Sequence, residues 1–191
     1  MLKNINSIMV VIVISGMPGC GSSTTAKLLA KKLKLKHFSL GSWNKSQIEK
    51  LSRKKPETET ERSIAMWKNK TGGSAKFHMD SDEFTKKVAK RGNVVIDAKL
   101  GITMLDRLYD FSVWLKAAKA MRIRRVAERD KISVSDAKKR LEQKESMERK
   151  NWKKIYGFDY FSQAKQADLI IDTGKHMPEE IVKIIIKEMN Q

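Results

Sequence analysis

The sequence predicts an α/β fold in which helices flank a parallel β-sheet. Two observations carry this prediction. Strongly apolar runs alternate along the chain with amphipathic segments, and the first such run leads through a glycine-rich loop into an amphipathic helix. The chain has 191 residues, of which 40% are hydrophobic and 32% charged, as expected for one globular domain. Ligands of such folds bind beyond the carboxyl ends of the strands.

The first strand is expected over Ser7–Ser15, SIMVVIVIS, because an unbroken β-branched run is typical of a strand buried on both faces. A helix is expected over Thr24–Leu35, where apolar residues recur with helical spacing. Its apolar stripe consists of Ala26, Leu29, Ala30 and Leu33. Strand and helix enclose the stretch SGMPGCGSSTT, so the glycines lie in the tight connection between them.

The rest of the chain continues the alternation. Four further strands are expected over Lys36–Ser42, Asn93–Ala98, Phe111–Ala117 and Ala167–Thr173. Short helices are expected at about 43–53, 57–68 and 80–90, in a polar region that we interpret as an insertion. Basic helices are expected at about 119–130 and 134–155, and a final helix over Pro178 to about Met189. Gly157 is expected to end the second basic helix.

Composition excludes several classes of protein. One cysteine, Cys20, rules out a disulfide framework and a multi-cysteine zinc site, and we interpret it as a small filler of the loop. The three histidines show no metal-ligand spacing. The longest apolar run, Ile8–Ile14, is too short for a membrane span or a secretion signal. We therefore expect a cytoplasmic protein without membrane contact, and a monomer.

The formal net charge of +18 is high for a small enzyme. Between Lys116 and Lys154 there are fifteen Lys/Arg and six Asp/Glu, a net charge of +9. A positive field attracts nucleotide phosphates or an RNA backbone. Lysine-rich helix faces can equally serve solubility alone, so both interpretations stay open.

The glycine loop has the pattern of a phosphate-binding loop, Gly16-x-x-x-x-Gly21, followed by Ser23. Such a loop binds phosphate through backbone N–H groups at a helix N-terminus, and its glycines allow the close approach. Ser22 stands where these loops carry a lysine. Lys27 lies about 500° around the helix from Ser22, at ~100° per residue. It should therefore point away from the loop, and a cation from elsewhere would have to act.

Five stretches, in chain order, resemble archaeal-type cytidylate kinases, a family of nucleoside monophosphate kinases with a P-loop fold: ISGMPGCGSSTTAKLLAKKLKLKHFSLG, RGNVVIDAKLG, VWLKAAKAMRIRRVAERDKISVSDA, KESMERKNWKKIYGFD and ADLIIDTGKHMPEEIVKII. The resemblance covers nearly the whole chain and is weakest in residues 43–80. It implies a five-stranded parallel sheet with flanking helices, and transfer of a phosphoryl group from ATP to CMP or dCMP with Mg²⁺. It also implies a core (1–41, 91–128 and 158–191), an inserted acceptor-binding subdomain (about 42–90) and a short basic lid (about 129–157).

The resemblance also implies roles for individual residues. ATP binding falls to the loop, namely Gly16, Met17, Pro18, Gly19, Cys20, Gly21, Ser22, Ser23 and Thr24. Acceptor binding falls to Gly41, Lys45, Asp97 and Lys99, and Mg²⁺ to Ser23 and Asp97. The catalytic positions are Ser22, Lys99, Arg125 and Arg129, and the lid contributes Asp130, Lys144 and Arg149. From the residues alone, Asp97 is equally well a strand-terminating aspartate.

Several positions depart from the family pattern. Ser22 replaces the loop lysine, Lys45 and Lys99 stand where the family has arginine, and Lys144 and Asn151 fall at two lid arginines. Arginine and lysine are not equivalent where two-pronged phosphate binding is needed. Three hypotheses follow: a (d)CMP kinase, a weak or inactive kinase-fold protein that binds nucleotide or RNA, and a kinase for another small acceptor.

Overall fold

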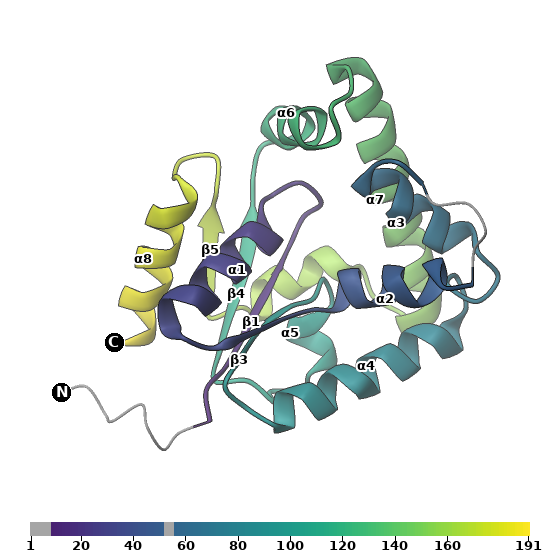
Figure 1. Ribbon diagram of the computed structural model, residues 1–191. Helices are drawn as coiled ribbons and strands as arrows, with labels where there is room; N and C mark the ends of the chain where they lie inside the picture. The colour runs from purple at the N-terminus through teal and green to yellow at the C-terminus, as the bar shows by residue number, and fades with distance from the viewer. Residues whose placement is uncertain (1–8, 52–55) are drawn as a thin grey trace.

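The computed structural model describes residues 9–51 and 56–191 and contains one five-stranded parallel sheet (Figure 1). The strand order is β2-β3-β1-β4-β5, and each neighbouring pair is parallel. The strands are β1 (Val11–Gly16), β2 (Lys36–Ser39), β3 (Val94–Asp97), β4 (Phe111–Lys116) and β5 (Leu169–Asp172). The predicted fold class is thus confirmed, and β1 lies at the centre of the sheet.

Helices cover both faces of the sheet. They are α1 (Ser22–Leu33), α2 (Leu40–Glu49), α3 (Glu59–Lys68), α4 (Ala75–Lys90), α5 (Gly101–Met104), α6 (Lys119–Asp130), α7 (Val134–Tyr156) and α8 (Pro178–Met189), with a 3-10 helix η1 (Tyr160–Gln166). Figure 1 shows α1 and α8 together on one side of the sheet, and α4 and α5 on the other. Among the described residues, no helix combines the length and apolarity that a membrane span requires.

The core is divided by the sheet into two clusters. Ile12 and Ile14 pack with α1 and α8, while Val11 and Val13 pack on the opposite side with Trp114. Alternate residues of β1 therefore enter different clusters, and every residue of this strand is buried. Burial on both faces explains why the first strand has no polar alternation in its sequence.

The structure differs from expectation at the edges of elements. The second strand ends at Ser39 rather than Ser42, because the Ser39 hydroxyl accepts a hydrogen bond from the backbone N–H of Ser42 and starts α2. Helix α4 begins at Ala75, earlier than expected, after the N-cap Ser74. Two short elements, α5 and η1, were not expected. The expected ends at residues 7–8 and 52–53 lie outside the described residues.

Candidate functional site

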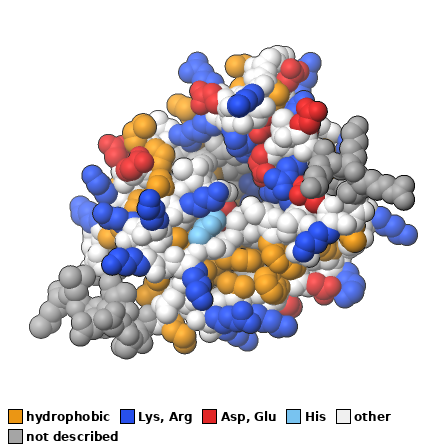
Figure 2. Space-filling view, in the orientation of Figure 1, with side chains coloured by type: hydrophobic (Ala, Val, Ile, Leu, Met, Phe, Trp, Pro, Cys, Tyr) orange, Lys and Arg blue, Asp and Glu red, His pale blue; other side chains and the backbone are white. Residues whose placement is uncertain are grey.

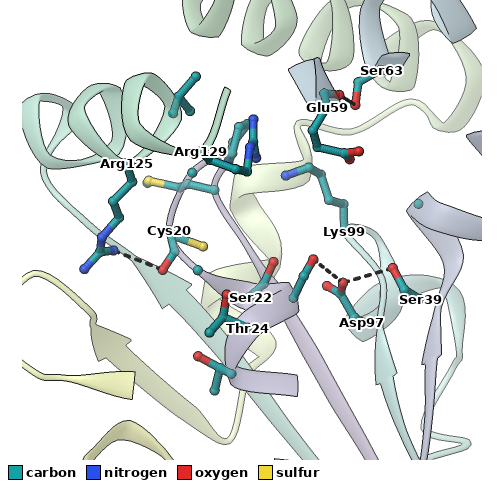
Figure 3. A pocket seen from close by; sticks show the side chains of 18 of the residues that line it. Cys20, Ser22, Thr24, Ser39, Glu59, Ser63, Asp97, Lys99, Arg125 and Arg129 are labelled. Atoms are coloured by element: carbon teal, nitrogen blue, oxygen red, sulfur yellow. Dashed lines mark hydrogen bonds between the residues drawn. The ribbon is translucent and has the colours of Figure 1, made fainter. Parts of the chain in front are cut away.

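A cleft of about 760 Å³ lies at the carboxyl ends of the strands. The glycine loop and the start of α1 form its floor, and residues of α2, α3, α6 and α7 form its walls. Figure 2 shows the hollow between the core and the helices above it, with acidic and basic side chains around its rim. The side chains in Figure 3 reach this one cavity from segments far apart in the sequence. The cleft therefore has polar and charged side chains among its apolar lining, and it is large enough for a nucleotide.

The backbone conformation of the glycine loop and its close packing require glycine at several positions. Gly19 and Gly21 have φ of +78° and +92°, which favour glycine. A Cβ on Gly16 would lie 2.5 Å from the carbonyl oxygen of Leu115. Gly21 is the N-cap of α1 and, within the described chain, no side chain caps this helix. The first N–H groups of α1 are thus open to an anion.

Two arginines of α6 hold the loop in place. The buried Arg122 guanidinium donates to the carbonyl oxygen of Pro18 at 3.1 Å. Arg125 donates to the Cys20 carbonyl oxygen at 3.3 Å and to both oxygens of Thr173, the hydroxyl and the carbonyl, at 2.7 Å each. The loop is therefore tied to α6 and to the residue after β5, and these contacts hold its backbone in place.

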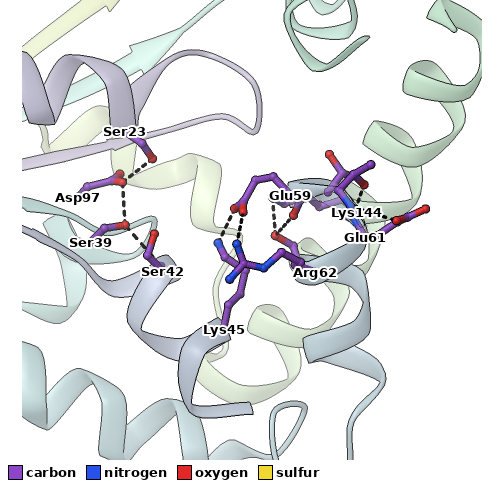
Figure 4. A network of polar contacts seen from close by, with 12 residues as sticks. Ser23, Ser39, Ser42, Lys45, Glu59, Glu61, Arg62, Asp97 and Lys144 are labelled. Atoms are coloured by element: carbon purple, nitrogen blue, oxygen red, sulfur yellow. Dashed lines mark hydrogen bonds and ion pairs between the residues drawn. The ribbon is translucent and has the colours of Figure 1, made fainter. Parts of the chain in front are cut away.

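Ser23, Asp97 and Ser39 form a compact oxygen cluster. The Ser23 hydroxyl donates to Asp97 Oδ2 at 2.6 Å, and the Ser39 hydroxyl donates to the same oxygen at 3.1 Å (Figure 4). Mg²⁺ prefers hard oxygen ligands and usually keeps waters and substrate oxygens beside one or two protein groups. Within the described residues, no group of three or more His, Cys, Asp or Glu side chains could hold a metal ion. The cluster fits a metal that is shared with a bound phosphate.

Lysines gather on the wall opposite the loop. Lys45 of α2 forms an ion pair with Glu59 of α3 at 2.5 Å (Figure 4). Lys144 of α7 donates to the hydroxyl of Ser63 at 3.0 Å. Burial lowers the pKa of Lys144 to about 8, only partly opposed by the nearby carboxylate of Glu148. This wall therefore presents lysine side chains to the cleft, and one of them, Lys144, has a lowered pKa.

Lys99 lies between the lysine wall and the loop. Its ammonium group donates to the carbonyl oxygen of Gly16 at 3.4 Å and lies 3.9 Å from Glu148 Oε2. Glu148 is buried and also lies 3.9 Å from the Lys144 ammonium group. One carboxylate is thus flanked by two lysines, neither of them within hydrogen-bond distance.

The other expected site residues divide into two groups. Arg129 lines the cleft, where it is paired with Asp130 at 2.8 Å and donates to the Thr60 hydroxyl at 2.7 Å. Gly41 and the loop residues Met17 to Thr24 also line it. Arg149 does not. It pairs with Asp159 and lies 4.9 Å above the ring of Phe161, so its expected part in the lid stays a prediction.

Three further side chains are not part of the cleft lining, namely Lys27, Trp114 and Trp43. Lys27 is exposed and is not among the residues that line the cleft, in agreement with the angle expected along the helix. Trp114 belongs to the core. Trp43 stacks on Phe84 with ring centroids 4.7 Å apart and does not line the cleft, so it is not placed to stack on a base there.

Sequence reasoning missed Glu59, Ser63 and Glu148, all of which line the cleft. Glu148 follows Lys144 by four residues on α7, and this spacing is a recognisable signal of a helical ion pair. No such signal exists for Glu59, which pairs with Lys45 only after α2 and α3 pack together.

Comparison with known proteins agrees with this geometry. The family model described as the cytidylate kinase-like family matches residues 11–175. A cytidylate kinase of Ignicoccus hospitalis is 35% identical over 177 residues, covering 93% of this chain and 97% of that protein. A cytidylate kinase of Sulfurisphaera tokodaii is 30% identical over 183 residues, covering 94% and 95%. A shikimate kinase structure from Bacteroides thetaiotaomicron superimposes with a TM-score of 0.63 at 18% identity, covering 96% of this chain and 100% of that one, which shows a shared fold.

Proposed function

The chain belongs to the cytidylate kinase-like family, and on that premise we propose that it transfers the γ-phosphoryl group of ATP to CMP or dCMP. The observation that carries the proposal is that a single cleft holds the uncapped N-terminus of α1, the Ser23–Asp97 pair and the lysines of the opposite wall. Family membership favours this kinase over the alternative of a non-catalytic nucleotide-binding or RNA-binding protein.

The donor nucleotide binds along the glycine loop. Backbone N–H groups between Gly16 and Thr24 hold the β- and γ-phosphates, and the positive end of the α1 dipole adds to their attraction. Arg125 and Arg129, from α6, line the cleft above the loop and add to its positive potential without direct contact to the phosphates (Figure 3). The open loop geometry supports this assignment, since phosphate binding of this kind needs no side chain at Ser22.

We assign the divalent metal ion to Ser23 and Asp97 and identify it as Mg²⁺. When bound, it would neutralise phosphate charge as the transition state forms. Asp97 would hold it through a carboxylate oxygen or a bound water, and Ser23 would add a hydroxyl oxygen. The 2.6 Å contact between the two side chains supports the assignment because it brings both oxygens to one point.

The acceptor monophosphate binds across the cleft, on the side of Gly41 and Lys45. An oxygen of its phosphate attacks the γ-phosphorus, the bond to the β-phosphate oxygen breaks, and ADP leaves with the electron pair. Positioning and charge stabilisation carry this reaction, without a covalent intermediate on the protein. We infer that residues of about 42–90 form the acceptor-binding subdomain and about 129–157 a lid, in a monomeric cytoplasmic protein. Contact of its basic surface with RNA stays a prediction.

The test is a coupled measurement of ADP formation with ATP and Mg²⁺ and each of CMP, dCMP, UMP and AMP. We expect turnover with CMP and dCMP, and weaker turnover with the other two. The absence of acceptor-dependent ADP formation with all four would overturn the proposal. If RNA then bound with a steep dependence on salt, the non-catalytic alternative would replace it.

A further inference from the structure

The loop lacks the cation that its type normally carries next to the β- and γ-phosphates. Ser22 lines the cleft at the start of α1, and its hydroxyl cannot supply a positive charge. Lys27, the next lysine along α1, is exposed and does not line the cleft. Among the described residues, the lysine and arginine side chains that do line it are Lys45, Lys99, Arg125, Arg129 and Lys144. One of these has to stand in for the missing charge if the site is to stabilise phosphoryl transfer.

The guanidinium groups of both arginines already donate hydrogen bonds to other protein groups. Arg125 donates three hydrogen bonds, to Cys20 and to Thr173. Arg129 is held by Asp130 and Thr60. Moving either guanidinium towards Ser22 would break short charge-assisted contacts, and Arg125 would also release the loop.

Two of the three lysines are committed as well. Lys45 lies against Glu59 at 2.5 Å. Lys144 is largely buried, with 12% of its side chain exposed, and donates to Ser63 on the wall opposite the loop. Both ammonium groups are thus held by residues of α3 and not by the glycine loop.

Lys99 differs from the other two cleft lysines in its contact with the glycine loop and in the length of its interactions. It is the cleft lysine that contacts the glycine loop itself, and its two interactions are long, 3.4 Å to the Gly16 carbonyl oxygen and 3.9 Å to Glu148. Burial raises the pKa of the Cys20 thiol in the loop, and the largest opposing influence is the charge of Lys99. Figure 3 shows Lys99 rising beside Asp97 into the cavity. Its flexible four-carbon stem can carry the ammonium group a short way to a phosphate.

Glu148 explains how a loosely held lysine stays near the loop. This carboxylate is buried, and its Oε2 atom has no hydrogen-bond partner among the described residues. It therefore provides a counter-charge for Lys99 at 3.9 Å without binding it tightly. A phosphate entering the loop offers the ammonium group a shorter, charge-assisted contact than either present partner.

We propose that Lys99 supplies the cation absent at Ser22, reaching the β- and γ-phosphates of the donor from the end of β3, with Glu148 as the positioning residue. The inference rests on the proposed kinase function and deepens it, because it assigns Lys99 to the donor rather than to the acceptor.

The test uses four variants: Lys99→Met, Ser22→Lys, the double variant Ser22→Lys/Lys99→Met, and Lys27→Met as a matched lysine control. Lys99→Met should lower kcat by roughly 10³, the order of effect of losing a charge at the transferred phosphoryl group. The KM for CMP should change less than threefold. The double variant should recover at least tenfold of the lost kcat, because a loop lysine then makes Lys99 dispensable. Lys27→Met should match the unaltered protein.

A binding measurement separates this inference from the kinase proposal. Calorimetry with ATP, ADP or CMP alone requires no turnover, and thermal melts of each variant confirm folding. Lys99→Met should weaken ATP and ADP binding about tenfold or more and leave CMP binding unchanged. Weaker CMP binding with unaltered ATP and ADP binding would assign Lys99 to the acceptor and overturn the inference. Failure of the double variant to recover activity, with ATP binding unaffected by Lys99→Met, would also overturn it. An unaltered protein without turnover that still shows the ATP effect would overturn only the kinase proposal.

Discussion

The Ser23 hydroxyl donates a 2.6 Å hydrogen bond to the carboxylate of Asp97. This contact joins the first turn of α1 to the carboxyl end of β3, across 74 residues of sequence. Ser39, at the end of β2, donates to the same carboxylate oxygen at 3.1 Å. Strand ends that lie side by side thus bring three oxygens together. These contacts fix the position of the glycine loop relative to the start of α2.

The metal assignment predicts a graded response at these oxygens. Asp97→Asn should lower kcat/KM by 10²-fold or more, because the amide removes the negative charge that a divalent ion requires. Ser23→Ala should raise the Mg²⁺ concentration needed for half-maximal activity by about 10- to 100-fold, the range typical of perturbing a ligand shell. Titration of activity with Mg²⁺ at saturating ATP measures both effects.

Ser39→Ala is the matched control for Ser23→Ala. It also removes a hydroxyl that donates to Asp97 Oδ2, but this is the longer of the two hydrogen bonds. The Ser39 hydroxyl additionally caps α2. It should change the Mg²⁺ requirement less than threefold. Equal effects of the two serine variants would mean that Ser23 orients Asp97 and does not itself contact the metal.

The elements that sequence predicted well are those with an unambiguous apolar pattern. The β1 run, VIVISG, is buried throughout, so its pattern directly reflects its place at the sheet centre. Gly157 has φ +80° at the end of α7, as its position after a helical pattern indicated. Short elements such as α5, with four residues, carry no periodicity that a sequence could reveal.

The site could be predicted only in part, for a physical reason. Side chains after parallel strands must meet at one edge of the sheet, so Ser39 and Asp97 could be expected near the loop. Glu59 and Ser63 come from α3, and their place opposite Lys45 and Lys144 depends on how the helices pack. The commitment of Arg149 to Asp159 is likewise a tertiary contact, across the turn after α7.

The glycine loop predicts a stability effect at Gly16. In Gly16→Ala, the added Cβ would lie 2.5 Å from the Leu115 carbonyl oxygen and 2.7 Å from Cys20 Sγ, so backbone has to shift. We expect a loss of about 1–3 kcal/mol in the free energy of unfolding, as for overpacking of a core. Chemical denaturation measures it.

Gly41→Ala provides the comparison, since the new methyl group would meet only Lys45 Nζ at 3.7 Å, inside helix α2. It should be neutral or stabilising by up to about 1 kcal/mol. Comparable destabilisation by both substitutions would show that close packing is not what requires glycine at Gly16.

A buried pair between α4 and α7 predicts a pH-dependent stability. The Tyr156 hydroxyl donates to Asp82 Oδ2, and burial raises the pKa of Asp82 to about 6, from an ordinary value of 3.8. Between these values the folded protein binds more protons than the unfolded chain, so stability falls as pH rises through this window. Asp82→Asn stays neutral and can still accept from Tyr156. It should raise Tm at pH 7.5, with the gain vanishing near pH 4.

Asp80→Asn is the matched control, because Asp80 lies exposed on the same helix in a surface ion pair with Lys76. Thermal melts between pH 4 and 8 should show little change for this variant. A gain for Asp82→Asn that is as large at pH 4 as at pH 7.5 would mean that ionisation of Asp82 is not its origin.

Lys144 predicts uptake of protons when nucleotide binds. Burial lowers its pKa to about 8, so near pH 8.5 a large share of the molecules carry it uncharged. A phosphate group in the cleft favours the charged form and raises this pKa, so binding at pH 8.5 should draw up to about one proton from solution. At pH 6.5 Lys144 is already charged, and its uptake should disappear.

Calorimetric titration with CMP in two buffers of different ionisation enthalpy measures the number of protons. Lys144→Met should abolish the uptake at pH 8.5, whereas Lys138→Met, an exposed lysine of the same helix, should leave it unchanged. The same lowered pKa means that the unfolded chain binds more protons between pH 8 and 10.5, so folding stability should rise with pH in that interval. Lys144→Met should flatten this rise. Proton uptake that persists in Lys144→Met would assign it to another group in the cleft and contradict the prediction.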